Sequence, residues 1–342
     1  MNVSLNELLK QTSRSFYLTL RVLPARVRPQ IGLAYLLART TDTIADTELV
    51  PLDQRLEALQ KLRERILGQT SAPLNFGELA ARQNLSAEKS LLEKIEASLS
   101  ALQNFSADDQ RLIREVLTTI TSGQELDLKR FTKSATGKII ALETAAELDD
   151  YTYRVAGCVG EFWTKMCRAH LFPNAKLDDS WLLTNGVRFG KGLQLVNILR
   201  DLPADLCKGR CYLPGEKLAE TGLAPADLLQ PANEPRLRPV YDRYLDLAEA
   251  HLSAGWEYTN ALPWRQARVR LACAWPILIG LKTIGRLRAG NVLDPQQRIK
   301  ISRREVRRLI LQSLLSYPWR GAWQKLVISA AGKAVASRAV LS

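Results

Sequence analysis

The chain has 342 residues, of which 46% are hydrophobic, and it carries a formal net charge of +13. This length and hydrophobic content exclude an intrinsically disordered chain and suffice for a substantial buried core. The five cysteines are odd in number and irregularly spaced, which favours reduced thiols over a disulfide framework.

The first residues show neither a basic segment followed by an apolar one nor a cleavage-site pattern, so we expect no secretory signal and a cytoplasmic protein. Apolar residues recur at helical spacing through most of the chain, which predicts an all-α protein. In chain order, helices are expected at about 30–47, 52–67, 86–103, 106–124, 138–169, 178–201, 236–260, 265–288 and 303–316. Long helices with short connections predict a bundle whose centre holds a cavity.

A first pair of acidic residues, Asp42 and Asp46, ends the apolar segment 30–47. A spacing of four places both carboxylates on one helix face, where they repel each other unless a cation binds them. Arg39, one turn before Asp42, would partly neutralise them. On its own, such a pair is more often a solvated helix end than a metal site.

A second acidic pair belongs to a longer polar stripe. Gln194, Asn197, Asp201 and Asp205 follow one another at steps of three, four and four along an otherwise apolar segment. The apolar neighbours predict an enclosed helix, in which carboxylates without partners would be costly. Magnesium prefers oxygen ligands and bridges carboxylates to phosphate, and arginines such as Arg200 suit phosphate oxygens. The two pairs together therefore predict a magnesium site that holds a substrate diphosphate.

Basic residues gather toward the C-terminus. From Arg286 onward, twelve lysines and arginines stand against two acidic residues, and Trp319 and Trp323 lie among them. Such a surface attracts nucleic acid, a phospholipid layer or a phosphorylated substrate, and charge alone does not choose among these. No apolar run is long enough for a spanning helix. The segment 317–342 is interpreted as a basic amphipathic tail that contacts a membrane peripherally, on its inner face.

Two stretches resemble signatures of the squalene/phytoene synthase family. QLVNILRDLPADLCKGRCYLP, at 194–214, is similar to the second aspartate-rich signature, and DYTYRVAGCVG, at 150–160, to the central YxxxVAGxVG signature. The resemblance extends from Ser13 to about Arg308. Within the family, SRSF at the start of this range and CAWP further on look like squalene synthases, whereas GRCYLP looks like bacterial carotenoid-forming members.

The resemblance implies a single isoprenoid-synthase-type domain over 1–316, with the two aspartate-rich helices facing each other across a central cavity. It implies that the four aspartates bind magnesium and that Tyr151 takes part in ionisation and proton removal. The positions that it implies for binding diphosphate or lining the site are Ser13, Arg14, Phe16, Tyr35, Arg39, Gln194, Asn197, Arg200, Arg210 and Tyr212. The chain departs from the family at Ala45 and Ala204, where relatives often carry glutamate. Pro203, inside the second pair, predicts a distorted helix.

The implied reaction is head-to-head condensation of two farnesyl diphosphates to presqualene diphosphate, followed by NADPH-dependent reduction to squalene. Alternatives are a phytoene or dehydrosqualene synthase, which ends by losing a proton, and an enzyme that stops at presqualene diphosphate. A basic helical module that binds nucleic acid or membrane is the rival from another class; the motifs favour the enzyme, and no nucleic acid is expected. NADPH rests on the resemblance, because Gly190 and Gly192 complete no dinucleotide fingerprint and are expected to serve helix packing.

Overall fold

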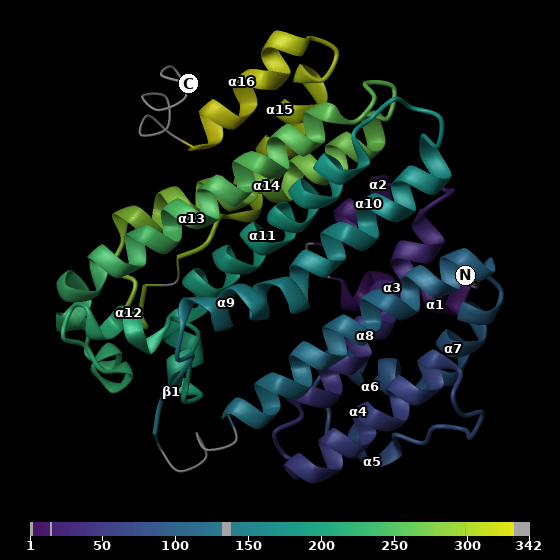
Figure 1. The fold of residues 1–342 in the computed structure, drawn as a ribbon, viewed down its shortest axis with the longest axis horizontal. Coiled ribbons are helices and arrows are strands. Elements are labelled where there is room, and N and C mark those ends of the chain that lie inside the picture. The colour runs from purple at the N-terminus through teal and green to yellow at the C-terminus, as the bar shows by residue number, and fades with distance from the viewer. Residues whose placement is uncertain (1–2, 14–15, 132–137, 298, 332–342) are drawn as a thin grey trace. The chain divides into compact units, whose positions relative to one another are not determined.

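The computed structural model describes the chain in four stretches, residues 3–13, 16–131, 138–297 and 299–331. Helices make up nearly all the regular structure of these stretches (Figure 1), so the prediction of an all-α protein is confirmed. The chain divides into two compact units, the first formed by 1–132 with 161–174 and the second by 133–160 with 175–342.

The first unit is organised around one helix, α3, which packs against α4, α7 and α8. Leu33, Leu36 and Leu37 of this helix are wholly buried, as their helical spacing on one face requires. The helices described in this unit are α1 (Val3–Thr12), α2 (Phe16–Val22), α3 (Arg28–Asp46), α4 (Leu52–Leu67), α5 (Gly77–Ala81), α6 (Ser86–Glu93), α7 (Ile95–Gln103) and α8 (Ala107–Arg130). The unit boundary falls within α10 (Cys158–Leu171).

The second unit is organised around three long helices, α11, α13 and α14, which run side by side (Figure 1). Its helices are α9 (Ala145–Thr152), the π-helical turn η2 (Tyr153–Gly157), α11 (Asp179–Cys207), α12 (Gly215–Ala219), the 3-10 turns η3 (Pro225–Leu229) and η4 (Pro231–Asn233), α13 (Glu234–Ala261), α14 (Ala267–Ala289), α15 (Arg303–Ser316) and α16 (Arg320–Ala331). Two short strands, β1 (Ile140–Ala141) and β2 (Arg210–Cys211), pair in parallel.

Several expected helix boundaries were wrong. The helix expected at 86–103 is broken at Lys94, and the one expected at 138–169 begins only at Ala145 and contains the π-helical turn. The helices expected to end at 124 and 201 continue to Arg130 and Cys207. The last turn of α8 carries Lys129 and Arg130, whose charges suit the negative end of the helix dipole. α11 continues through Pro203, which lies between its two acidic residues.

Glycines allow η2 and α10 to approach α11 at backbone distance. A Cβ added at Gly190 would lie 2.1 Å from the carbonyl oxygen of Ala156, and one at Gly160 would lie 1.8 Å from that of Gly186. A Cβ added at Gly192 would lie 2.9 Å from the Cβ of His251. The prediction that Gly190 and Gly192 serve helix packing is therefore confirmed.

The start of the expected C-terminal tail is a packed helix. α16 lies against α14, and Trp323 is 0% exposed. Its indole N–H donates to Asn260 Oδ1 over 2.8 Å, and its ring stacks on Trp256. Trp323 therefore cannot insert into a membrane interface as expected, whereas Trp319 is 66% exposed. None of the helices in the described residues is long and apolar enough to cross a bilayer, and all five cysteines are free thiols.

We predict that Gly190→Ala lowers the free energy of unfolding by about 1–3 kcal/mol, because the new methyl group would collide with backbone rather than with a movable side chain. Denaturant unfolding followed by circular dichroism measures this change. Gly285→Ala is the matched control, since nothing lies within 4 Å of its Cβ position and alanine favours a helix by up to about 1 kcal/mol. Equal effects of the two substitutions would contradict the close approach.

Candidate functional site

In the first unit, α3 carries Asp42 and Asp46 one turn apart, near its C-terminal end. Asp42 Oδ1 accepts a hydrogen bond of 2.5 Å from Gln124 Nε2 on α8. Its other oxygen lies 3.5 Å from Arg39 Nη1, while Arg39 Nη2 binds Glu88 over 2.6 Å. The expected pairing of Arg39 with the aspartates is thus present, although Glu88 holds the arginine more closely.

The two carboxylates of this pair raise the energy of each other's charged form. Loss of surrounding water and repulsion from Asp46 raise the pKa of Asp42 from 3.8 to about 6, although 48% of its side chain stays exposed. Asp46 is exposed and makes no side-chain hydrogen bond or ion pair within the described part of the chain. An added cation would relieve this repulsion.

The oxygen atoms here fit a magnesium ion that keeps some of its own water. Gln124 Oε1 is buried and has no hydrogen-bond partner among the described residues, beside a carboxylate with a raised pKa. Among those same residues, no three acidic, histidine or cysteine side chains come together as a ready-made metal cage. Magnesium is commonly held by one or two carboxylates plus substrate phosphates, so the donors present suit it in that manner.

The other site residues expected in this unit differ in how far the structure describes them and in what they contact. Tyr35, one turn before Arg39, donates its hydroxyl to the carbonyl of Thr12 over 3.2 Å. Ser13 is buried, and its hydroxyl donates to the carbonyl of Leu9, so it is turned toward α1. Arg14 lies outside the described residues, and Phe16 is described only as the first residue of α2.

In the second unit, α11 carries the predicted polar stripe, but the stripe is not enclosed. Asn197 is exposed, Gln194 and Asp205 are partly exposed, and 48% of the Asp201 side chain is exposed. The apolar side chains between them are buried, since α11 packs against α13 and α14. The expectation of a buried stripe was wrong because the apolar residues occupy one face only and leave the polar face outside that packing.

Arg200 donates two hydrogen bonds to the Asp201 carboxylate, one of 2.8 Å from Nε and one of 2.5 Å from Nη2. These bonds raise the pKa of the Arg200 guanidinium, so it stays charged. Asn197 Nδ2 lies 3.5 Å from Gln194 Oε1, at the outer limit of a hydrogen bond. The stripe therefore presents oxygen acceptors next to a fixed guanidinium, the combination that suits a metal-bound phosphate.

The central motif and the end of the second signature meet at a pair of tyrosines. The Tyr151 and Tyr212 rings stack, with centroids 4.7 Å apart and planes 22° apart. Gly209, at φ 73°, turns the chain after α11, and β2 pairs with β1 so that Arg210 lies opposite Ile140. This pairing fixes the chain that carries Arg210 and Tyr212. The π-helical turn η2 follows Tyr151 directly, and such turns are frequent at functional sites.

Sequence reasoning missed Gln124 and Glu88, which hold Asp42 and Arg39. A weak signal was present for Gln124, because GQELD places this polar side chain one turn before an acidic residue, Asp127, on an amphipathic helix. Glu88 has no such signal, since it lies in the first turn of a helix that follows an irregular loop.

We predict that Asp42→Asn raises the unfolding temperature of the metal-free chain by about 1–2 °C at pH 7.5, after allowance for the exposed half of the side chain. With a pKa of 3.8 unfolded and about 6 folded, the folded chain binds more protons in that window, so wild-type stability falls as pH rises through it. The gain should therefore shrink toward zero near pH 4. Differential scanning calorimetry across pH measures it.

Asp46→Asn is the matched variant, because it keeps Asp42 ionisable but removes its repelling neighbour and should move the pH window downward. A destabilised Asp42→Asn chain at pH 7.5 would show that its contacts with Gln124 and Arg39 outweigh the repulsion.

A family model described as squalene/phytoene synthase matches residues 9–305. The chain is similar to the bifunctional lycopene cyclase/phytoene synthase of Colletotrichum graminicola, with 30% identity over 298 residues, which is 83% of this chain and 46% of that protein. It is also similar to the presqualene diphosphate synthase of Rhodopseudomonas palustris, with 31% identity over 251 residues, 73% of this chain and 76% of that one. The chain thus spans under half the length of the first relative and about three quarters of the second.

Among solved structures, the complex of TcSQS with the ligand E5700 matches with a TM-score of 0.73 and 23% identity, covering 96% of each chain. At this identity the likeness shows the fold, and it agrees with the helical architecture expected from the sequence.

Proposed function

Because this chain belongs to the squalene/phytoene synthase family, we propose that it condenses two farnesyl diphosphates head to head and releases inorganic diphosphate. The observation that carries the proposal is a repeated arrangement, one copy in each unit: two aspartates one turn apart, with an arginine bound to the first of them. One such pair is common by chance. Two of them, each on its own helix and each with its own arginine, are characteristic of diphosphate chemistry.

Each proposed role follows from the chemistry of the side chain. The aspartate pairs would hold magnesium, which when bound stabilises the negative charge of the departing diphosphate. Arg39 and Arg200 would move from carboxylate to phosphate oxygens, and Arg210 would add a third guanidinium. Tyr151, stacked on Tyr212, is a hydroxyl held in fixed orientation, suited to accept or relay the proton lost in condensation.

The proposed product is presqualene diphosphate, which is then reduced to squalene with NADPH. The first step is supported by the presqualene diphosphate synthase relative, which the chain matches over 76% of that protein's length. The reduction rests on the squalene-synthase-like segments alone. Phytoene or dehydrosqualene synthesis remains the second candidate, favoured by the phytoene synthase relative.

We predict that the purified chain with farnesyl diphosphate and magnesium accumulates presqualene diphosphate when NADPH is absent and forms squalene when it is present. Mass spectrometry of the extracted lipids identifies both products. If farnesyl diphosphate gives no coupled product and geranylgeranyl diphosphate gives phytoene, the proposed substrate is wrong and the longer diphosphate is the substrate.

Variants of the aspartates separate this enzyme from a basic module that only binds nucleic acid or membrane. Asp42→Asn and Asp201→Asn should each lower turnover at least about a hundredfold, because each weakens the charge that holds the metal. Glu57→Gln, an exposed acid of α4, is the control and should leave turnover unchanged. Full turnover in both aspartate variants would overturn the enzymatic role, and salt-sensitive binding to RNA or DNA would then favour the module.

We also propose that the protein is cytoplasmic and binds the inner face of a membrane peripherally through α15 and α16. The fully exposed side chains of α15 and α16 are basic, apolar or uncharged polar, and none of them is acidic. The basic members of this surface are Arg303, Arg304, Arg307, Arg308, Arg320 and Lys325, and its large apolar members are Leu311, Leu314, Leu315, Trp319 and Ile328. Glu305, the acidic residue of this stretch, forms an ion pair with Arg286 and accepts a hydrogen bond from the Ser302 hydroxyl. Exposed basic side chains together with exposed leucines and a tryptophan complement an anionic lipid surface.

We predict that the chain co-sediments with vesicles of phosphatidylcholine and phosphatidylserine, and less with phosphatidylcholine alone. The double variant Leu315→Ser with Trp319→Ser should weaken this binding about tenfold or more, because two exposed apolar anchors are lost. Leu49→Ser, an equally exposed leucine of the first unit, is the control. If vesicle binding depends neither on lipid charge nor on the two substituted residues, the proposal that α15 and α16 bind the membrane is wrong.

A further inference from the structure

α11 passes through a proline between its two acidic residues. Pro203 has no backbone N–H, so the carbonyl of Leu199, four residues earlier, lacks the donor that every regular helix position provides. Leu199 is 1% exposed, which leaves little room for water to replace that donor. A buried carbonyl without a donor is destabilising and would favour an early end of the helix.

The missing donor comes from a neighbouring helix. Tyr241 on α13 donates its hydroxyl to the Leu199 carbonyl over 2.7 Å. Tyr241 is 0% exposed, and burial raises the pKa of its hydroxyl far above the usual value, so the group remains a proton donor at any physiological pH. A proline ring also crowds the carbonyl four residues earlier, and the Tyr241 hydroxyl reaches that carbonyl from outside the helix.

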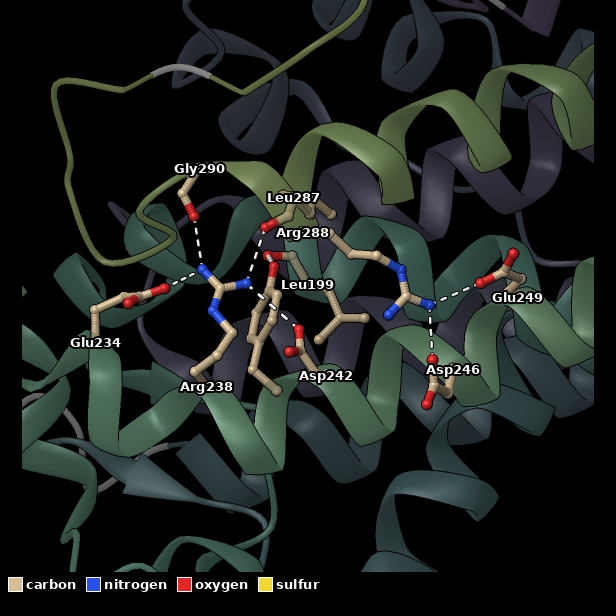
Figure 2. Close-up of polar contacts among 10 residues, drawn as sticks. Leu199, Glu234, Arg238, Asp242, Asp246, Glu249, Leu287, Arg288 and Gly290 are labelled. Carbon is tan, nitrogen blue, oxygen red and sulfur yellow. Dashed lines mark hydrogen bonds and ion pairs between the residues drawn. The ribbon is translucent and has the colours of Figure 1, made fainter. Parts of the chain in front are cut away.

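Tyr241 is itself held in place from the side of α14. Figure 2 shows Arg238, one turn earlier on α13, donating to the carbonyls of Leu287 and Gly290 at the end of α14, over 3.0 and 2.6 Å. Its guanidinium also binds Glu234 and lies 5.5 Å from the centroid of the Tyr241 ring. The contacts of Arg238 therefore hold the Tyr241 ring, and with it the hydroxyl, between α13 and α14.

A second arginine strengthens this support. Arg288 on α14 binds Asp246 and Glu249 of α13, each over 2.7 Å (Figure 2). The two helices are thus joined on both sides of Tyr241, by hydrogen bonds from Arg238 to backbone carbonyls and by the ion pairs of Arg288, which limits how far the Tyr241 hydroxyl can move away from Leu199.

We infer that Tyr241 is a positioning residue, which keeps α11 helical through Pro203 and so holds Asp201 and Asp205 one turn apart for a divalent cation and its diphosphate. This role rests on the proposed function, because it concerns the same aspartate pair. Tyr241 acts through the backbone of α11 and not on the substrate.

A double-mutant cycle tests the role, because alanine at position 203 restores the backbone N–H that the tyrosine replaces. We expect Tyr241→Phe alone to weaken binding of magnesium with inorganic pyrophosphate about five- to tenfold in isothermal titration calorimetry, and to lower the unfolding temperature by about 2–6 °C. In a Pro203→Ala background the same substitution should change neither quantity. Such strong non-additivity is expected only of partners that share one interaction.

Tyr244→Phe is the matched control. Tyr244 lies on the same helix and is buried, but its hydroxyl makes no hydrogen bond within the described residues, so its loss should leave pyrophosphate binding unchanged. Equal losses for Tyr241→Phe in both backgrounds, or lost stability with unchanged pyrophosphate affinity, would overturn the positioning role. Absence of magnesium pyrophosphate binding in the wild-type chain would instead overturn the proposed function, and the stability arm of the cycle would still test the hydrogen bond.

Discussion

The burial of one face of α11 against α13 and α14 is the constraint on which the second unit depends. Because a helix repeats every 3.6 residues, packing Leu195, Ile198, Leu199 and Leu202 inward turns the polar stripe outward as a set. The glycines that face η2 and α10 then allow a second backbone to approach the same helix closely. The register of the aspartates is thus decided by packing far more than by their own contacts.

Much of the fold could be predicted because apolar periodicity is a local signal. The helices expected at 52–67 and 303–316 matched the structure in full. Each has a clear boundary residue: Gly68, in the left-handed conformation, ends the first, and Ser302 caps the start of the second. The break at Lys94 could not be predicted, because the residues on either side of it are ordinary helix formers, and the π-helical turn after Tyr151 contains no residue that specifies this kind of turn. Tertiary packing decides them.

The site shows the same division between local and distant information. Arg39 with Asp42, and Arg200 with Asp201, are near neighbours in sequence; the first pairing was expected, whereas Arg200 was expected to bind phosphate and not Asp201. Gln124 lies 82 residues from Asp42, and Glu88 lies 49 residues from Arg39, so their roles appear only once the chain is folded. The stripe was expected to be buried because composition reveals which residues are apolar, but not which face of the helix is covered.

In both units an arginine already occupies the first aspartate of the pair. Such an arginine cannot serve a carboxylate and a phosphate with the same N–H groups. In the proposed function, a cation that bound the carboxylate would release the guanidinium for the diphosphate, and a diphosphate that bound the guanidinium would free the carboxylate for the cation. Each ligand would then lower the cost of binding the other, so metal and substrate would be thermodynamically coupled, with the arginine side chain as the exchangeable counter-ion between them.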